Sequence, residues 1–160
     1  MTDRKSDPEA YRKIELPSAN GDGITVEVYF HRKYQVVPKS LDEADQKVVR
    51  NIEDRPFDID TLLAYFEVKE SGGDELVNNF DPPLELKVTY SARAWKKAIK
   101  ADFERPRLAY LVWKIDSWSE KWIEFTKEIT AILPPDTCDD PYGYIYLTIK
   151  ELEDPLIGGC

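Results

Sequence analysis

The chain has 160 residues, of which 31 are acidic and 22 are basic, so its net charge is −9. This length is enough to bury a hydrophobic core without help from metals or disulfides, and we expect one domain. A negative surface repels phosphate groups, which disfavours nucleic acid and anionic membranes as partners. Aromatic residues make up 12 % of the chain, a content that is typical of folded rather than disordered sequences.

The cysteine content and the absence of long apolar runs bear on the expected compartment. Cys138 and Cys160 are too few for a disulfide framework, and no apolar run resembles a signal peptide or a membrane span, so the cytoplasm is the expected location. Residues 1–20 are polar and contain two prolines. We expect them to form a loosely ordered arm, in which only residues 11–16 have a strand-like pattern.

A strand is predicted over residues 24–30, where apolar and more polar side chains alternate. A second short extended run covers residues 34–37. Ser40 and Glu43 then have the spacing of a capping box, and the residues that follow place Leu41, Ala44, Val48 and Ile52 on one helical face. This pattern predicts a short amphipathic helix over residues 40–52.

The middle of the chain contains two further strands. Residues 62–68 alternate, and Gly72-Gly73 favours a hairpin that returns toward Phe80. Residues 84–90 alternate most clearly, with an apolar face made of Leu84, Leu86, Val88 and Tyr90. The preceding Pro82-Pro83 pair lacks backbone donors, so a hydrogen-bonded ladder should not continue through it. Residues 84–90 are therefore predicted to form a central antiparallel strand.

Ser91 is placed to cap a short helix that carries Trp95, Ala98 and Ile99 on one side. The other side holds the only markedly basic stretch, made of Arg93, Lys96, Lys97 and Lys100. Residues 108–115 are nearly all apolar, which fits a strand covered on both faces or a helix segment. Pro106 and the β-branched and aromatic content favour the strand.

A turn at residues 116–120, a returning strand at 121–125, a loop at 134–143 and a strand at 144–150 complete the pattern. About seven short strands without βαβ alternation predict an all-β fold, an antiparallel immunoglobulin-like β-sandwich with one or two short helical insertions. A single domain should cover residues 21–157. Its core should bury five side chains together: Phe66, Leu86, Val88, Val112 and Ile145.

The order of several segments resembles a known group of domains. The segments are Phe80–Tyr90, Leu111-Val112-Trp113, Trp122 after a tight turn, and Tyr144–Leu147 before Asp154-Pro155. Over roughly residues 60–157 this order is similar to β-sandwich domains related to those of ankyrins and netrin receptors. In that group a Phe-x-x-Pro start leads a strand, and a later hairpin carries a Trp that closes the sandwich end. The resemblance implies a domain that mediates contacts between proteins and has no catalytic residues. The segments 40–52 and 91–101 depart from the pattern.

Few residues are candidates for chemistry. His31 is the only histidine, and a surface position at a strand end fits it better than a catalytic role. The acidic neighbours of Cys138 raise the pKa expected for its thiol, which favours an inert cysteine. Three acidic residues of the 134–143 loop, Asp136, Asp139 and Asp140, offer oxygen ligands for calcium, but their spacing fits a solvated turn better. No enzyme activity, cofactor or metal is expected.

Two hypotheses remain for function. Trp118 lies at a predicted turn, and with Tyr142 and Tyr144 it forms a candidate aromatic surface for binding another protein or a sugar ring; the alternative is that Trp118 packs against a neighbouring loop. The main hypothesis is therefore a non-enzymatic protein-binding module, of undetermined oligomeric state. The alternative is a ubiquitin-like modifier that acts through Gly158 and Gly159 after removal of Cys160, because unbranched residues can thread narrow active sites. Residues 158–160 are otherwise expected to be a flexible tail.

Overall fold

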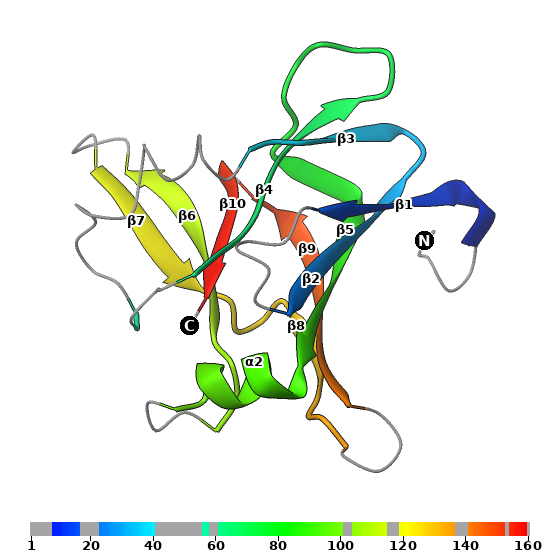
Figure 1. The fold of residues 1–160 in the computed structure, drawn as a ribbon. Helices are drawn as coiled ribbons and strands as arrows, with labels where there is room; N and C mark the ends of the chain where they lie inside the picture. The colour runs from blue at the N-terminus through cyan, green and yellow to red at the C-terminus, as the bar shows by residue number, and fades with distance from the viewer. Residues whose placement is uncertain are drawn as a thin grey trace.

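The computed structural model describes residues 8–16, 23–40, 56–57, 61–100, 104–114, 119–136, 141–152 and 154–159. These residues form two five-stranded antiparallel sheets (Figure 1). Sheet 1 has the order β1 (Tyr11–Leu16), β2 (Ile24–His31), β5 (Asn79–Ser91), β9 (Tyr142–Glu151) and β8 (Ile129–Leu133). Sheet 2 has the order β3 (Tyr34–Pro38), β4 (Thr61–Glu70), β10 (Asp154–Gly159), β6 (Leu108–Lys114) and β7 (Ser119–Glu124). The predicted all-β, antiparallel two-sheet fold is confirmed.

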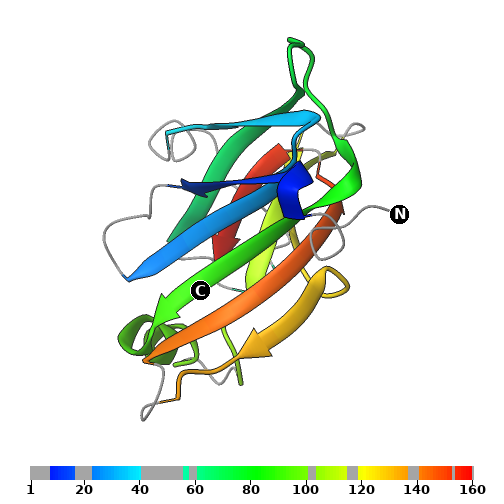
Figure 2. The ribbon, with the colours of Figure 1, turned by 90° about the vertical axis from the view of Figure 1, so that its right-hand side faces the viewer.

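The main core takes its side chains from both sheets, which lie one in front of the other in Figure 2. Phe66 of β4, Leu86 and Val88 of β5, and Ile145 of β9 are all fully buried in one cluster, as predicted. Val112 is an exception, because it is only half-buried and lines a surface groove at the side of the sandwich. Buried and less buried residues alternate along β2, β5 and β9, because one face of each strand packs on the core and the other is directed outward.

Part of sheet 2 buries apolar side chains on both faces. The outer sides of β6, β7 and β10 contribute Ala109, Leu111, Trp122 and Leu156 to a second buried cluster, which Phe57 completes. Leu108 belongs to the main core and Ala109 and Leu111 to the second cluster, so burial on both faces explains the apolar start of β6. The strand interpretation of this stretch is confirmed, whereas the predicted helix over residues 40–52 lies almost wholly outside the described ranges.

The predicted strand over residues 84–90 is the centre of sheet 1, and it extends further than expected. β5 begins at Asn79, before the prolines. Asn79 pairs with Glu151 of β9 and the next pair is Leu84 with Ile149, so the register shifts between them. Pro82 and Pro83 lie in this interruption, as expected because prolines have no backbone N–H to donate. Ser91 ends the strand and accepts a hydrogen bond from the Ala94 amide (3.1 Å), which caps α2 (Ala92–Ala98) as predicted.

Both ends of the described chain are more ordered than predicted. Residues 11–16 are not part of a loose arm: β1 pairs with β2 from Tyr11–His31 to Leu16–Val26, and Leu16 is 2 % exposed. β8, which the sequence analysis did not predict, is the opposite edge of sheet 1, and three of its five residues are half-buried. Edge strands need only one partner and one buried face, so their sequences carry weak patterns.

The expected flexible tail is also corrected. Gly158 and Gly159 belong to β10, where they pair with β4 on one side and with β6 on the other. Both glycines are buried. A β-carbon on Gly159 would lie 3.1 Å from the Arg107 carbonyl oxygen and 3.1 Å from Leu63, so the close approach of neighbouring strands favours glycine at this position.

Candidate functional site

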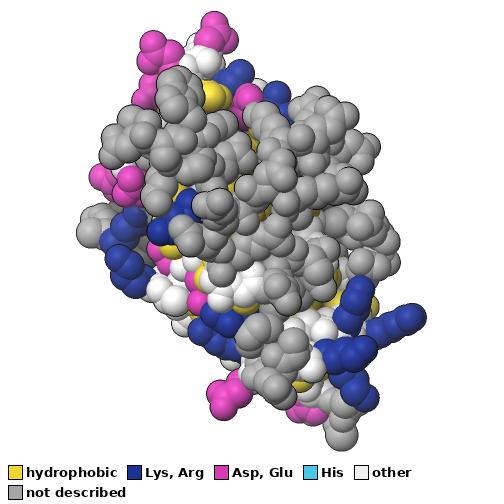
Figure 3. Space-filling view, turned by 90° about the vertical axis from the view of Figure 1, so that its left-hand side faces the viewer, with side chains coloured by type: hydrophobic (Ala, Val, Ile, Leu, Met, Phe, Trp, Pro, Cys, Tyr) yellow, Lys and Arg dark blue, Asp and Glu magenta, His cyan; other side chains and the backbone are white. Residues whose placement is uncertain are grey.

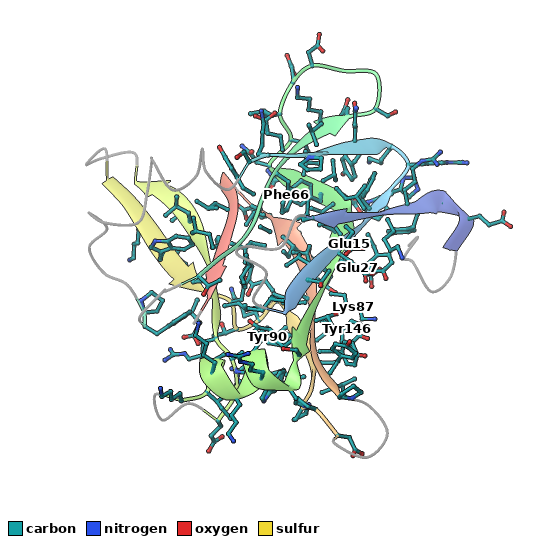
Figure 4. The ribbon with its side chains drawn as sticks, in the orientation of Figure 1. Glu15, Glu27, Phe66, Lys87, Tyr90 and Tyr146 are labelled. Atoms are coloured by element: carbon teal, nitrogen blue, oxygen red, sulfur yellow. The ribbon has the colours of Figure 1, made fainter. Side chains whose placement is uncertain are left out.

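The outer face of sheet 1 differs from the outer face of sheet 2. Among the described residues, its side chains are half-buried or exposed, whereas sheet 2 buries a second apolar cluster. One row crosses the face through Glu15, Glu27, Lys87 and Tyr146, which occupy paired positions on β1, β2, β5 and β9. Figure 4 shows this row on one side of the sheet, while Tyr90 and Phe66 lie toward the interior. An antiparallel sheet with one solvated face has this alternation.

Three tyrosines on β9 form the aromatic part of this face. Tyr142, Tyr144 and Tyr146 are two residues apart and therefore project to the same side of the strand. We call them the tyrosine stripe. Tyr142 is 47 % exposed, and the rings of Tyr144 and Tyr146 are 6.4 Å apart between centroids. On the neighbouring strand β8, Leu133 pairs with Tyr144 and is 50 % exposed.

Lys87 gives the stripe a positive charge. Its Nζ atom lies 4.8 Å from the ring centroid of Tyr144 and 5.9 Å from that of Tyr146, which is cation–π geometry. The pairing of Lys87 with Tyr146 across β5 and β9 brings these groups together. The aliphatic part of the lysine covers the sheet while its ammonium group stays at the surface.

The β1–β2 side of the same face is acidic. Glu15 and Glu27 are cross-strand neighbours, and Glu27 accepts a hydrogen bond from the Tyr29 hydroxyl (2.8 Å). The Lys13 ammonium group is 3.9 Å from the same Glu27 carboxylate. This side of the face therefore carries two carboxylates with one lysine and one tyrosine beside them, whereas the β9 side carries the tyrosine stripe and Lys87.

The position of the stripe relative to α2 is fixed by a close contact. Trp95 of α2 is buried and meets Tyr90 edge-on, with centroids 5.7 Å apart. A β-carbon on Gly143 would lie 2.3 Å from Trp95 Cε3 and 2.9 Å from Pro135 Cδ. Only glycine leaves room for the indole here, so the residue between Tyr142 and Tyr144 anchors the helix against β9.

A groove of about 950 Å³ lies between the β6–β7 pair and the chain around β8 and β9. Tyr110, Val112 and Ile123 form its apolar part, and its charged lining has both signs: Glu124, Lys127, Glu128, Lys150 and Glu151. The mixed lining points to no single class of ligand.

Glu124, at the border of this groove, is already engaged. The Arg107 guanidinium donates two hydrogen bonds to its carboxylate, at 2.7 and 2.6 Å. These hydrogen bonds are the main reason that the pKa of Glu124 lies below the ordinary value of 4.5. A carboxylate held ionised in this way is a poor general acid.

The predicted binding residues are only partly placed. Tyr142 and Tyr144 lie on one face of β9, as a shared surface requires, whereas Trp118 lies outside the described residues. The sequence analysis missed Tyr146, Lys87 and Leu133. The regular spacing of tyrosines at positions 142, 144 and 146 would have revealed Tyr146, but the other two depend on strand pairing.

Two of the remaining candidates, His31 and Asp136, lie within the described ranges. His31 is at the end of β2, where its Nδ1 accepts a hydrogen bond from the Lys33 amide (3.1 Å) and its ring meets Tyr11 edge-on. Asp136 is exposed, and Cys138, Asp139 and Asp140 are not among the described residues. Within the described part of the chain, no three His, Cys, Asp or Glu side chains are grouped in a way that could hold a metal ion.

Comparison with family models, with curated proteins and with solved structures finds no match. In the described ranges, no helix has the length and apolar character needed to cross a membrane.

Proposed function

We propose that this chain is a non-enzymatic protein-binding module whose contact surface is the tyrosine stripe together with Lys87 and Leu133. The observation that carries the proposal is the alignment of three tyrosines on the outward side of β9, next to an exposed leucine. Tyrosine provides a large contact area at a small cost in conformational entropy, and it is enriched among residues that dominate binding energy. The immunoglobulin-like character, the likeness to the ankyrin and netrin-receptor domains and the cytoplasmic location stay predictions.

The modifier alternative gains no support. Gly158 and Gly159 would have to leave β10 before an activating enzyme could reach them, and β10 pairs on both sides within sheet 2. Extraction of a doubly paired, buried strand costs much of the stability of the fold.

The proposal is tested with a double variant, Tyr144→Ser with Tyr146→Ser. Protein captured from lysate by the wild type is purified and titrated against each form by calorimetry. The double variant should bind at least tenfold more weakly, which corresponds to about 1.4 kcal/mol. Leu76→Ser, at an exposed leucine after the β4 turn, is the matched control and should bind like the wild type.

Circular dichroism during thermal unfolding must show that both variants remain folded. Equal affinity of the wild type and the double variant would remove the tyrosine stripe from the binding surface. A loss of affinity in Leu76→Ser of the same size would show that the effect is not specific to the stripe.

A further inference from the structure

The exposed side of α2 is basic in an acidic protein. Arg93, Lys96 and Lys97 of α2, and Lys100 just after its end, are all exposed, and residues 91–100 contain no acidic residue, although the chain has a net charge of −9. Figure 3 shows Lys and Arg side chains gathered at the end of the molecule where α2 lies. Within the described ranges, no carboxylate forms a salt bridge with any of the four.

Helix stability does not explain this charge. Ala94, Trp95 and Ala98 anchor the other side of α2 in the core, so the four cations are held toward solvent. Lys96 and Lys97 are in the last turn, where the helix dipole favours cations, but Arg93 is in the first turn, where the dipole disfavours them. Arg93 and Lys97 are four residues apart on α2, a spacing at which like charges repel.

The basic side of α2 continues from the tyrosine stripe. Ser91, the cap of α2, is the cross-strand partner of Tyr142, and Trp95 packs against Gly143. The start of α2 therefore adjoins the Tyr142 end of the stripe, and Arg93 is the cation of α2 closest to it in sequence. The tyrosine rings would give a bound partner its contact area, and the four cations would attract it at long range. Lys87 adds a fifth positive charge within the stripe.

We infer that the segment recognised by this module is an acidic peptide segment of a partner protein, with its aromatic or aliphatic side chains on the tyrosine stripe and its carboxylates on the exposed side of α2. This inference rests on the proposed function and adds the chemistry of the partner. The surrounding negative charge repels an acidic segment elsewhere on the surface, so charge complementarity directs it to this end of the molecule. The same net charge weakens binding of nucleic acid.

The test selects peptides from a random 12-residue display library on the wild-type protein. Enriched peptides should contain several Asp or Glu residues and at least one aromatic or aliphatic residue. Their affinity, measured by fluorescence anisotropy, should fall at least tenfold in the double variant Arg93→Glu with Lys97→Glu, and it should fall as salt is raised.

The matched control is Lys127→Glu with Lys150→Glu, which changes the net charge equally but lies at the groove. It should retain wild-type affinity. A loss of affinity for the selected peptides in Tyr144→Ser with Tyr146→Ser but not in the α2 variant would overturn the inference and leave the proposed function standing. Unchanged affinity in both would overturn both.

Two further results would also overturn the inference. One is enrichment of peptides without acidic residues. The other is tighter, α2-dependent binding of a DNA duplex or of phosphatidylserine vesicles than of the selected peptides, since the basic surface would then serve a phosphate-bearing partner.

Discussion

Arg107 and Glu124 form the shortest ion pair among those described for this protein. The other three, Lys13–Glu27, Lys39–Glu67 and Lys69–Glu67, are 3.3–3.9 Å long. Arg107 also lies 4.6 Å from the ring centroid of Phe57, so its guanidinium is held between an aromatic ring and a carboxylate. Planar contacts of this kind are specific to arginine, and they border the second apolar cluster of sheet 2.

Glu124→Gln should lower the free energy of unfolding by about 1–2 kcal/mol at neutral pH, because the charged partner of two hydrogen bonds is lost. The lowered pKa of Glu124 gives the pair a stabilising effect that is complete above 4.5 and is lost as the pH falls through the lowered pKa. Urea unfolding at a series of pH values should therefore show the difference between wild type and variant shrink below pH 4.5. A difference that grows in acid would show that the pair has the opposite effect.

At the scale of elements, the contact between α2 and β9 depends on a residue without a side chain. Gly143 faces the Trp95 indole, and Trp95 in turn packs on Tyr90. The same contact determines where the tyrosine stripe ends and where α2 begins, so structure and binding surface are linked at one position.

Gly143→Ala should lower the free energy of unfolding by about 1–3 kcal/mol, the usual cost of overpacking a well-filled site. The new methyl group would lie within 2.7 Å of two indole carbons unless α2 shifts. Denaturant unfolding measures the cost. Gly73→Ala is the control, since its β-carbon meets neighbours only at 3.4 Å and beyond, and it should change stability by less than about 0.5 kcal/mol. Equal effects of the two substitutions would contradict the proposed packing.

At the scale of the whole molecule, sheet 2 is held together by its last strand. β10 separates β4 from β6, and the structure describes no direct pairing of those two strands. Ile157 on one face and Leu156 on the other join the main core and the second cluster.

Deletion of residues 154–160 should therefore abolish cooperative unfolding, because it removes two ladders and buried side chains of both clusters at once. Far-ultraviolet circular dichroism and a thermal scan measure this. Gly159→Ala should be milder, with a lowered Tm but a retained transition. A truncated chain that unfolds cooperatively near the wild-type Tm would mean that the last residues behave as the tail expected from the sequence.

The strands that the sequence predicted best are those whose pattern depends only on a single buried face. Residues 24–30 and 84–90 alternate because β2 and β5 have the core on one side and solvent on the other. β10 lacked this signal, since Leu156 and Ile157 are buried on opposite faces and two glycines follow. Its position depends on β4 and β6, which are distant in sequence.

The sequence predicted part of the tyrosine stripe but not the residues around it. Aromatic type and position along the chain were enough to select Tyr142 and Tyr144. Lys87 and Leu133 belong to the same surface only through the pairing of β5 and β8 with β9, which no local pattern specifies.

The position of β10 has a consequence for synthesis on the ribosome. A nascent chain emerges from its N-terminus, so β4 and β6 leave the exit tunnel well before residues 154–159 can pair with them. During this interval each has an open edge that can pair with another strand, including one from a neighbouring nascent chain. Sheet 2 can therefore close only after residues 154–159 have left the exit tunnel.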